Sequence, residues 1–166
     1  MKKVLITGAS RGIGRAIATR LTQDGYQVIN FDLSAPSSLL GGEEFHCIDV
    51  TDSNALKDLV QEITSRTEVV RLVNNAGMIK PGALEDVAEK DFDAVYALNL
   101  KAPMVLAQCL MPQMRKANFG RIVNIASRAA LGKEERTAYA ATKAGVLGMT
   151  RTWALELAQF GITVNA

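Results

Sequence analysis

The sequence is poor in the residues that build metal sites and disulfide frameworks. Its 166 residues include two cysteines and one histidine. Cys47 and Cys109 lie far apart and have no metal-ligand spacing, so neither a zinc site nor a disulfide framework is expected. His46 alone cannot form a histidine-rich metal site, and although one histidine would suffice for a Ser-His-Asp triad, its neighbours do not indicate one. We therefore expect two free thiols, no metal and a cytoplasmic protein.

The chain also lacks an excess of charge and a long apolar run. Lys and Arg number 19 and Asp and Glu number 17, all scattered, so no basic face for nucleic acid or a membrane surface is expected. The apolar run Val4–Ile6 stops at Thr7 and is too short for a signal peptide, and we expect no segment that spans a bilayer. With 48% hydrophobic and 22% charged residues, the composition is that of an ordinary globular protein.

Short apolar runs alternate with segments of helical periodicity along the whole chain. The runs predict strands at 4–7, 27–31, 45–48, 69–73, 121–125 and 162–164. The periodic segments predict helices at 12–21, from about 53 to 63, at 86–98, from about 99 to 114 and at 138–160. A break near Asn99 is expected because Pro103 fits best in the first turn of a new helix.

This strict alternation predicts right-handed crossovers, a parallel sheet and helices on both of its faces. The strands are continuous apolar runs, as strands buried on two faces require. We therefore expect an α/β protein with a doubly wound parallel sheet of the Rossmann type, in which residues 1–166 form a single dinucleotide-binding domain. Its ligand crevice should lie at the carboxyl ends of the strands.

A glycine-rich loop joins the first predicted strand to the first helix. It reads Thr-Gly-Ala-Ser-Arg-Gly-Ile-Gly over residues 7–14. Gly8 suits a tight turn, Gly12 would let the backbone approach a pyrophosphate, and Gly14 would allow close packing of the helix on the strand. The N–H groups at the helix N-terminus would bind the phosphates. Glycines also occur in ordinary turns, but a position directly after the first strand favours nucleotide binding.

Asp32 ends the second predicted strand, where a carboxylate can accept hydrogen bonds from the adenosine ribose of a dinucleotide. It could equally cap a loop. Together with the glycine loop it favours NAD, because a fixed carboxylate repels the 2′-phosphate of NADP. Arg11 has the opposite effect, since its guanidinium could bind that phosphate. We predict that NAD is preferred and keep NADP as the alternative.

Five motifs in register resemble the short-chain dehydrogenase/reductase family. They are the loop at 7–14, Asn-Asn-Ala-Gly at 74–77, Asn99, Ser127 and Tyr-Ala-Ala-Thr-Lys at 139–143. The resemblance extends over the whole chain and implies an NAD(P)-dependent oxidoreductase with the catalytic set Asn99, Ser127, Tyr139 and Lys143. It implies that the cofactor is bound by Gly8, Ser10, Arg11, Gly12, Ile13, Gly14, Asp32, Asp49, Val50, Asn75, Ala76, Gly77, Tyr139 and Lys143. In this set, residues 49 and 50 would contact the adenine and residues 75–77 would flank it.

Tyr139 and Lys143 are four residues apart, so on a helix they share one face. Alone, this spacing would describe an ordinary surface pair. In the family context, a nearby ammonium and an oxidised nicotinamide would lower the tyrosine pKa from its free value of about 10. Tyr139 would then take a proton from an alcohol as hydride leaves, while Ser127 holds the substrate oxygen. Lys143 would also hold the nicotinamide ribose, and Asn99 would bind a water of a proton relay.

Three features depart from the family pattern. The segment between Asp32 and Asp49 is short, which implies a loop in place of the usual helix. Residues 133–136, Lys-Glu-Glu-Arg, form either a solvated loop or a contact for a polar substrate. The chain ends at Ala166, where relatives continue with more sheet and a substrate lobe. We therefore expect a C-terminally incomplete domain that cannot turn over substrate by itself.

The last predicted helix is apolar on several faces, which indicates either core alone or core plus a subunit interface. The resemblance implies a homodimer or homotetramer built from this helix and the one before it. Three functions remain open. They are an NAD-dependent enzyme for a secondary alcohol and its ketone, an NADPH-dependent reductase of carrier-bound 3-oxoacyl groups, and a non-catalytic nucleotide-binding protein.

Overall fold

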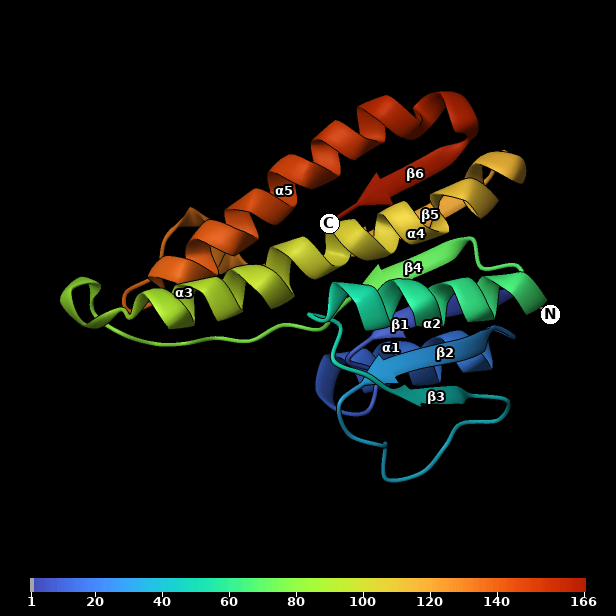
Figure 1. The fold of residues 1–166 in the computed structure, drawn as a ribbon, viewed down its shortest axis with the longest axis horizontal. Coiled ribbons are helices and arrows are strands. Elements are labelled where there is room, and N and C mark those ends of the chain that lie inside the picture. The colour runs from blue at the N-terminus through green and yellow to red at the C-terminus, as the bar shows by residue number, and fades with distance from the viewer. Residues whose placement is uncertain (1) are drawn as a thin grey trace.

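The computed structural model describes residues 2–166, which form one parallel sheet with helices packed against it (Figure 1). The sheet has six strands in the order β3-β2-β1-β4-β5-β6. Their bounds are β1 Lys3–Thr7, β2 Gln27–Asp32, β3 Glu44–Cys47, β4 Arg71–Asn74, β5 Gly120–Asn124 and β6 Ile162–Asn165. Every neighbouring pair is parallel. The predicted Rossmann-type sheet is thereby confirmed, and its order reverses between β1 and β4, where such sheets bind ligands.

Helices pack against the sheet and bury two separate apolar clusters. Their bounds are α1 Gly12–Gln23, α2 Ser53–Arg66, α3 Glu89–Tyr96, α4 Ala102–Lys116 and α5 Thr137–Leu157. Alternate residues of β1 point to opposite faces, so Leu5 joins the larger cluster with α2 and α4 while Val4 and Ile6 join the smaller one with α1. The central strands are therefore buried on both faces, as their continuous apolar runs predict.

The strands at the other edge of the sheet differ from this expectation. In β5 the buried residues alternate with exposed ones, and in β6 Thr163 and Asn165 are exposed while Ile162 and Val164 are buried. The reason is the position of α1, which packs against β1 and β2 and leaves the same face of β5 and β6 open within residues 2–166. The prediction of helices on both faces holds for the β1–β2 half of the sheet and is wrong for β5 and β6.

The predicted helix break near Asn99 is also wrong. Residues Ala97–Lys101 form a π turn that joins α3 to α4, and the N–H of Ala102 donates to the carbonyl of Ala97 five residues back. Pro103 lies in the first turn of α4, as expected. The chain can continue through it because the widened turn accommodates the ring and the missing N–H without unwinding the helix.

As a consequence, residues Glu89–Lys116 form one helix of 28 residues whose most apolar stretch has a mean hydropathy of 1.3. By length and composition alone this helix could cross a membrane, which the sequence analysis did not predict. Its apolar side chains have a different explanation, because Val105, Leu106 and Leu110 are buried in the larger core cluster beneath it.

Two loops agree with the sequence. Residues 34–43, between β2 and β3, contain no helix, as the short spacing between Asp32 and Asp49 implies. The start of α2 is capped by Asp52, whose Oδ1 accepts hydrogen bonds from the N–H groups of Asn54 and Ala55.

Candidate active site

The glycine-rich loop runs from the end of β1 into the start of α1. Gly12 has a left-handed backbone with φ +57°, and a Cβ built there would have no atom within 4 Å, so this turn is open on its outer side. Gly14 is the opposite case, because a Cβ there would lie 2.0 Å from the carbonyl oxygen of Gly8. Its missing side chain lets the helix start fold back onto the loop, and this contact explains why glycine is required there.

Asn75, at the end of β4, ties this loop to the neighbouring strand. Its Nδ2 donates to the carbonyl oxygens of Thr7 and Gly8 at 3.0 and 2.9 Å. In return, the hydroxyl oxygen of Thr7 accepts hydrogen bonds from the N–H groups of Asn75 and Ala76 at 3.1 and 3.0 Å. The ends of β1 and β4 are thus joined at the point where the strand order reverses. Thr7 was not singled out from the sequence, since its partners lie in another strand.

A cavity of about 610 Å³ opens at this edge of the sheet. Most of the predicted cofactor-binding residues line it: Gly8, Arg11, Ile13, Gly14, Asp32, Asp49, Val50, Asn75, Ala76 and Gly77. The other four predicted cofactor-binding residues are not among the lining residues: Ser10, Gly12, Tyr139 and Lys143. Apolar side chains that sequence reasoning missed complete the wall, among them Phe31, Leu33 and Ile48. The cavity therefore combines polar loop ends with an apolar surface, as pockets for small molecules usually do.

Asp32 lies at the end of β2 and contributes to the cavity wall in two ways. Its Oδ2 accepts a hydrogen bond from the N–H of Ser10 at 3.0 Å, which connects it to the glycine loop. Its Oδ1 accepts from the N–H groups of Leu33 and Ser34 at 2.8 and 3.4 Å. Asp32 therefore caps the loop and also places its carboxylate at the cavity. The two roles considered from the sequence, a loop cap and a carboxylate at the ligand crevice, are compatible in this structure.

Asn99 lies in the π turn and is buried, with 2% of its surface exposed. Its Oδ1 accepts from the N–H of Met78 at 2.9 Å, and its Nδ2 donates to the Met78 carbonyl at 3.0 Å and to the hydroxyl of Thr142 at 3.3 Å. Thr142 in turn donates to the carbonyl of Tyr139. Thr142, which the sequence analysis did not single out, therefore links Asn99 to the helix that carries Tyr139 and Lys143.

Lys143 is buried in α5 next to Tyr139. Its Nζ donates to the carbonyl of Ile125 at 2.5 Å and lies 5.6 Å from the centroid of the Tyr139 ring. Burial lowers the pKa of Lys143, because an ammonium group loses solvation inside the protein. A charged or readily deprotonated amine beside a phenol is the arrangement that proton transfer requires.

Gly77 connects the cavity to these side chains. It lines the cavity, and a Cβ built on it would lie 3.3 Å from Asn99 Oδ1 and 3.8 Å from Lys143 Nζ. A Cβ at this position would be tight against Asn99 Oδ1 and in ordinary contact with Lys143 Nζ. The absence of a side chain at Gly77 therefore lets one end of the cavity border directly on Asn99 and Lys143.

Ser127 follows β5 and begins a 3₁₀ turn at Arg128–Leu131 that packs against α5. Its hydroxyl oxygen accepts a hydrogen bond from the N–H of Ala129 at 3.2 Å, so it caps this turn. The hydroxyl hydrogen remains available to another acceptor. The charged residues Lys133, Glu134 and Glu135 are exposed, which agrees with a solvated loop. Within residues 2–166, no three His, Cys, Asp or Glu side chains converge as metal ligands.

Comparison with known proteins gives consistent matches. The family model described as short chain dehydrogenase matches residues 2–166. A 3-oxoacyl-[acyl-carrier-protein] reductase of Thermotoga maritima is 39% identical, over 99% of this chain and 72% of its own length. The structure of a short-chain dehydrogenase from Streptomyces avermitilis superposes with a TM-score of 0.93 at 35% identity, over 98% of this chain. This chain spans 63% of that structure's length. A 4-hydroxyisoleucine dehydrogenase complexed with NADH gives a TM-score of 0.92 at 29% identity, over 99% of this chain and 73% of its own.

Proposed function

Because the chain belongs to the short-chain dehydrogenase/reductase family of oxidoreductases, we propose that it interconverts a secondary alcohol and a ketone by hydride transfer, with NAD(H) preferred. We further propose that residues 1–166 are the dinucleotide-binding and catalytic part of a single, C-terminally incomplete domain of a cytoplasmic enzyme. The cofactor would supply or accept the hydride. The residues of this chain would bind it, orient the substrate and move the proton.

The observation that carries the proposal is the contact at Gly77. One cavity has the carboxylate of Asp32 in its wall and Gly77 in the same wall, and Gly77 lies against Asn99 and Lys143. A dinucleotide with its adenosine ribose at Asp32 and its nicotinamide end near Lys143 would extend along this wall. The open outer side of Gly12 and the helix start at α1 suit the diphosphate between them.

In this proposal Tyr139 moves the proton. Lys143 is buried and its charge stabilises the phenolate over the phenol, so Tyr139 can accept a proton from an alcohol or return it to a ketone. Ser127 donates its hydroxyl hydrogen to the substrate oxygen. Asn99 holds the backbone of Met78 through two hydrogen bonds and thereby fixes the segment after Gly77 that borders Lys143.

The preference for NAD rests on Asp32. A 2′-phosphate at this position would meet a carboxylate that already accepts three backbone hydrogen bonds and is held in place by them. Arg11, which also lines the cavity, favours NADP but is exposed and carries no comparable constraint. The solved relative with NADH supports the same choice.

A second candidate is an NADPH-dependent 3-oxoacyl-[acyl-carrier-protein] reductase. It is favoured by the relative of that name in Thermotoga maritima, which is 39% identical. A non-catalytic nucleotide-binding protein is the third and is disfavoured by the complete set Ser127, Tyr139 and Lys143. Turnover by the full-length enzyme of a panel of secondary alcohols, ketones and an acetoacetyl thioester, each with NAD(H) and NADP(H), distinguishes the three. Activity on the thioester with NADPH alone would favour the second candidate, and no turnover with cofactor binding would favour the third.

We also propose a homodimer or homotetramer that associates through α4 and α5. A groove of about 620 Å³ runs between these helices, and its wall includes Met104, Met111 and Trp153. Such an apolar groove is an unusual feature on the surface of a monomer. Light scattering coupled to size-exclusion chromatography measures the mass, and a monomer at micromolar concentration would contradict the proposal.

A further inference from the structure

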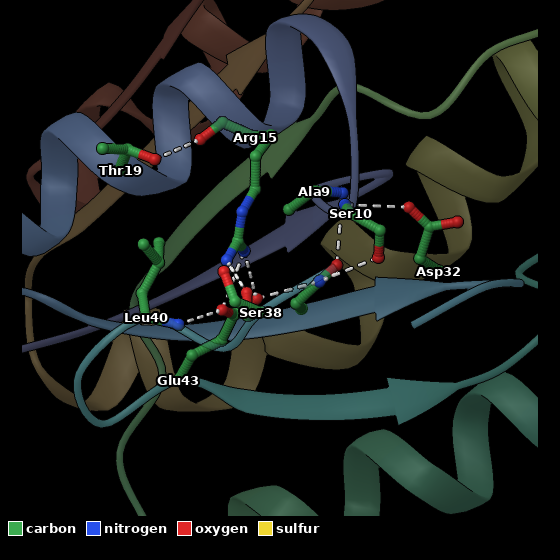
Figure 2. A network of polar contacts seen from close by, with 9 residues as sticks. Ala9, Ser10, Arg15, Thr19, Asp32, Ser38, Leu40 and Glu43 are labelled. Atoms are coloured by element: carbon green, nitrogen blue, oxygen red, sulfur yellow. Dashed lines mark hydrogen bonds and ion pairs between the residues drawn. The ribbon is translucent and has the colours of Figure 1, made fainter. Parts of the chain in front are cut away.

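A buried polar network lies directly beneath the glycine-rich loop (Figure 2). At its centre is Glu43, the last residue of the loop between β2 and β3, whose side chain is fully buried. Both of its carboxylate oxygens accept hydrogen bonds from Nη1 of Arg15 on α1 at 2.8 Å. An ion pair this deeply buried persists only where its remaining hydrogen-bonding groups are also satisfied. Neither residue is explained by the proposed chemistry.

One side of the network holds the loop at residues 34–43. Glu43 Oε2 accepts from the N–H of Leu40 at 2.8 Å, and the second guanidinium nitrogen of Arg15 donates to the carbonyl of Ser38. These contacts fasten the loop to α1. The same loop begins at Leu33, beside Asp32 in the cavity wall, so its anchoring also restrains that wall.

The other side of the network reaches the glycine loop through Asn30, which is completely buried in β2. Its Nδ2 donates to Glu43 Oε1 at 3.0 Å and to the hydroxyl oxygen of Ser10 at 3.1 Å. Its Oδ1 accepts from the N–H of Ala9 at 3.2 Å. The carboxylate of Glu43 can only accept and the N–H of Ala9 can only donate, so the two together hold the Asn30 amide in this orientation. Both hydrogens of that amide nitrogen are then used, and Ser10 must act as the acceptor in its contact with Asn30.

The hydroxyl hydrogen of Ser10 is consequently left to point elsewhere. We propose that Glu43, paired with Arg15, is a positioning residue that helps to keep the Asn30 amide oriented and the Ser10 hydroxyl free to donate, and that holds the adjoining loop in place beside Asp32. This inference rests on the proposed binding of a dinucleotide in the cavity. It assigns Glu43 to affinity for the adenosine diphosphate part, without a role in proton transfer at Tyr139.

Glu43→Gln tests this assignment with little change of shape. In the wild type, both carboxylate oxygens accept hydrogen bonds: Oε1 from Arg15 and Asn30, and Oε2 from Arg15 and Leu40. A glutamine has an N–H₂ group in place of one of these oxygens. Whichever oxygen it replaces, the N–H₂ group faces a donor to which it cannot bond. A glutamine N–H₂ in the place of Oε1 could not accept from Asn30 Nδ2, so that contact would be lost. We expect the Kd for ADP to rise about tenfold, the size of one lost charge-assisted hydrogen bond. The Kd for reduced nicotinamide mononucleotide should stay within about twofold.

Gln113→Glu is the matched control. Gln113 is a partly buried amide whose Nε2 donates to the carbonyls of Thr64 and Thr67 and whose Oε1 accepts from the N–H of Val69, far from the glycine loop along the chain. Gln113→Glu also disrupts a set of side-chain hydrogen bonds to the backbone, so it should lower Tm. The Kd values for ADP and for reduced nicotinamide mononucleotide should stay unchanged. Arg15→Lys is a milder change at the other end of the ion pair and should raise the Kd for ADP about threefold. It replaces Glu43→Gln as the test of the proposal if that variant does not fold.

Calorimetric titration of the purified proteins with ADP measures the Kd values that test the positioning role of Glu43. The inference predicts tight binding by the wild type and by Gln113→Glu and weaker binding by Glu43→Gln and Arg15→Lys. If the wild type binds ADP and the Glu43 and Arg15 variants bind it equally well, the positioning role is wrong while the proposed function stands. Equal weakening by Gln113→Glu would reduce the effect to general destabilisation and also overturn the role. A wild type that binds neither ADP nor NADH would overturn the proposed function itself.

Discussion

The two ends of the proposed dinucleotide site, one around Asp32 and the other around Lys143, differ in how completely the protein satisfies its own polar groups. At the adenosine end, Asn30 makes three hydrogen bonds to protein atoms and Asp32 accepts three. At the catalytic end, Lys143 donates to one carbonyl, Ser127 accepts one bond, and Tyr139 contributes no hydroxyl hydrogen bond to residues 2–166. One end is built before a ligand arrives, and the other keeps unused donors and acceptors. Polar groups that are already held in place favour tight binding, because little order is lost when the ligand binds. Free donors and acceptors are needed for catalysis, because they must bond to the reacting groups.

Tyr139→Phe should separate the two ends most sharply. It removes one oxygen that makes no bond to the protein, so we expect a loss of turnover of about 10²–10⁴-fold with an unchanged Kd for NADH. Steady-state rates and fluorescence titration measure the two quantities. Tyr26→Phe, at the opposite edge of the sheet, is the control and should behave as wild type. A near-normal rate for Tyr139→Phe would remove the residue from the mechanism.

Lys143→Met should weaken NADH binding and reduce the rate by about 10²-fold or more, yet raise stability by about 1 kcal/mol. The stabilisation is expected because burial lowers the pKa of Lys143. In the wild type, burying the charged ammonium group lowers the free energy of unfolding, and this destabilisation is fully present below the folded-state pKa of Lys143. It disappears as the pH rises from that pKa to the ordinary value of 10.5, so the stability of the wild type should increase over this pH range. Urea unfolding of both proteins from pH 7 to 10.5 measures it. A variant less stable than wild type at pH 7 would contradict the account.

Asp32→Ser probes the adenosine end alone. It removes a carboxylate that would accept from the ribose and repel a 2′-phosphate, so discrimination between NAD and NADP should narrow or reverse by about 1–3 kcal/mol. Titration of the wild type and variant with NADH and NADPH gives the ratio of Kd values. If the wild type already binds NADPH more tightly, Arg11 sets the preference.

Glu44→Gln should have the smallest effect, because Glu44 lies on the edge strand β3 and outside the cavity. Burial raises the pKa of Glu44, but hydrogen bonds and charge from Arg66 and His46 outweigh it, so the net pKa is lowered. The stabilisation is therefore present above the ordinary pKa of 4.5 and lost as pH falls through the lower folded value. We expect a deficit of under about 1 kcal/mol at pH 7 that shrinks in acid. A deficit that persists unchanged in urea unfolding at low pH would contradict this.

The sequence predicted the sheet well because its strands are buried runs between clear turn signals. The predicted strands lie within a residue or two of those observed, and α2 begins at Ser53, where the periodic pattern placed its start. The π turn at Ala97–Lys101 was missed because helical periodicity and a proline look the same whether a helix breaks or widens. The open face of β5 and β6 was missed because an apolar run does not indicate which helix covers it.

The site was predicted as a set of residues, and the structure adds the contacts among them. The cavity brings most of the proposed cofactor-binding residues together, and Gly77 joins it to Asn99 and Lys143. Their catalytic roles remain predictions. Thr7 belongs to the glycine-rich motif but was given no role there. Asn30 and Glu43 had no signal in the sequence, because their partners are strands or loops away and nothing local marks them. Residues that hold a site in place are thus harder to predict than residues that belong to a motif.

The central claim is that the adenosine end of the dinucleotide binds in the cavity at Asp32, while its nicotinamide end reaches Lys143 beyond Gly77. Calorimetric titration of Asp32→Ser and Lys143→Met with ADP and with NADH tests it directly. The account predicts that Asp32→Ser weakens both ligands by the same factor, whereas Lys143→Met weakens NADH and leaves the Kd for ADP unchanged. Weakening of ADP by Lys143→Met to the same extent as NADH, or unchanged ADP binding by Asp32→Ser, would contradict the division of the site into these two ends.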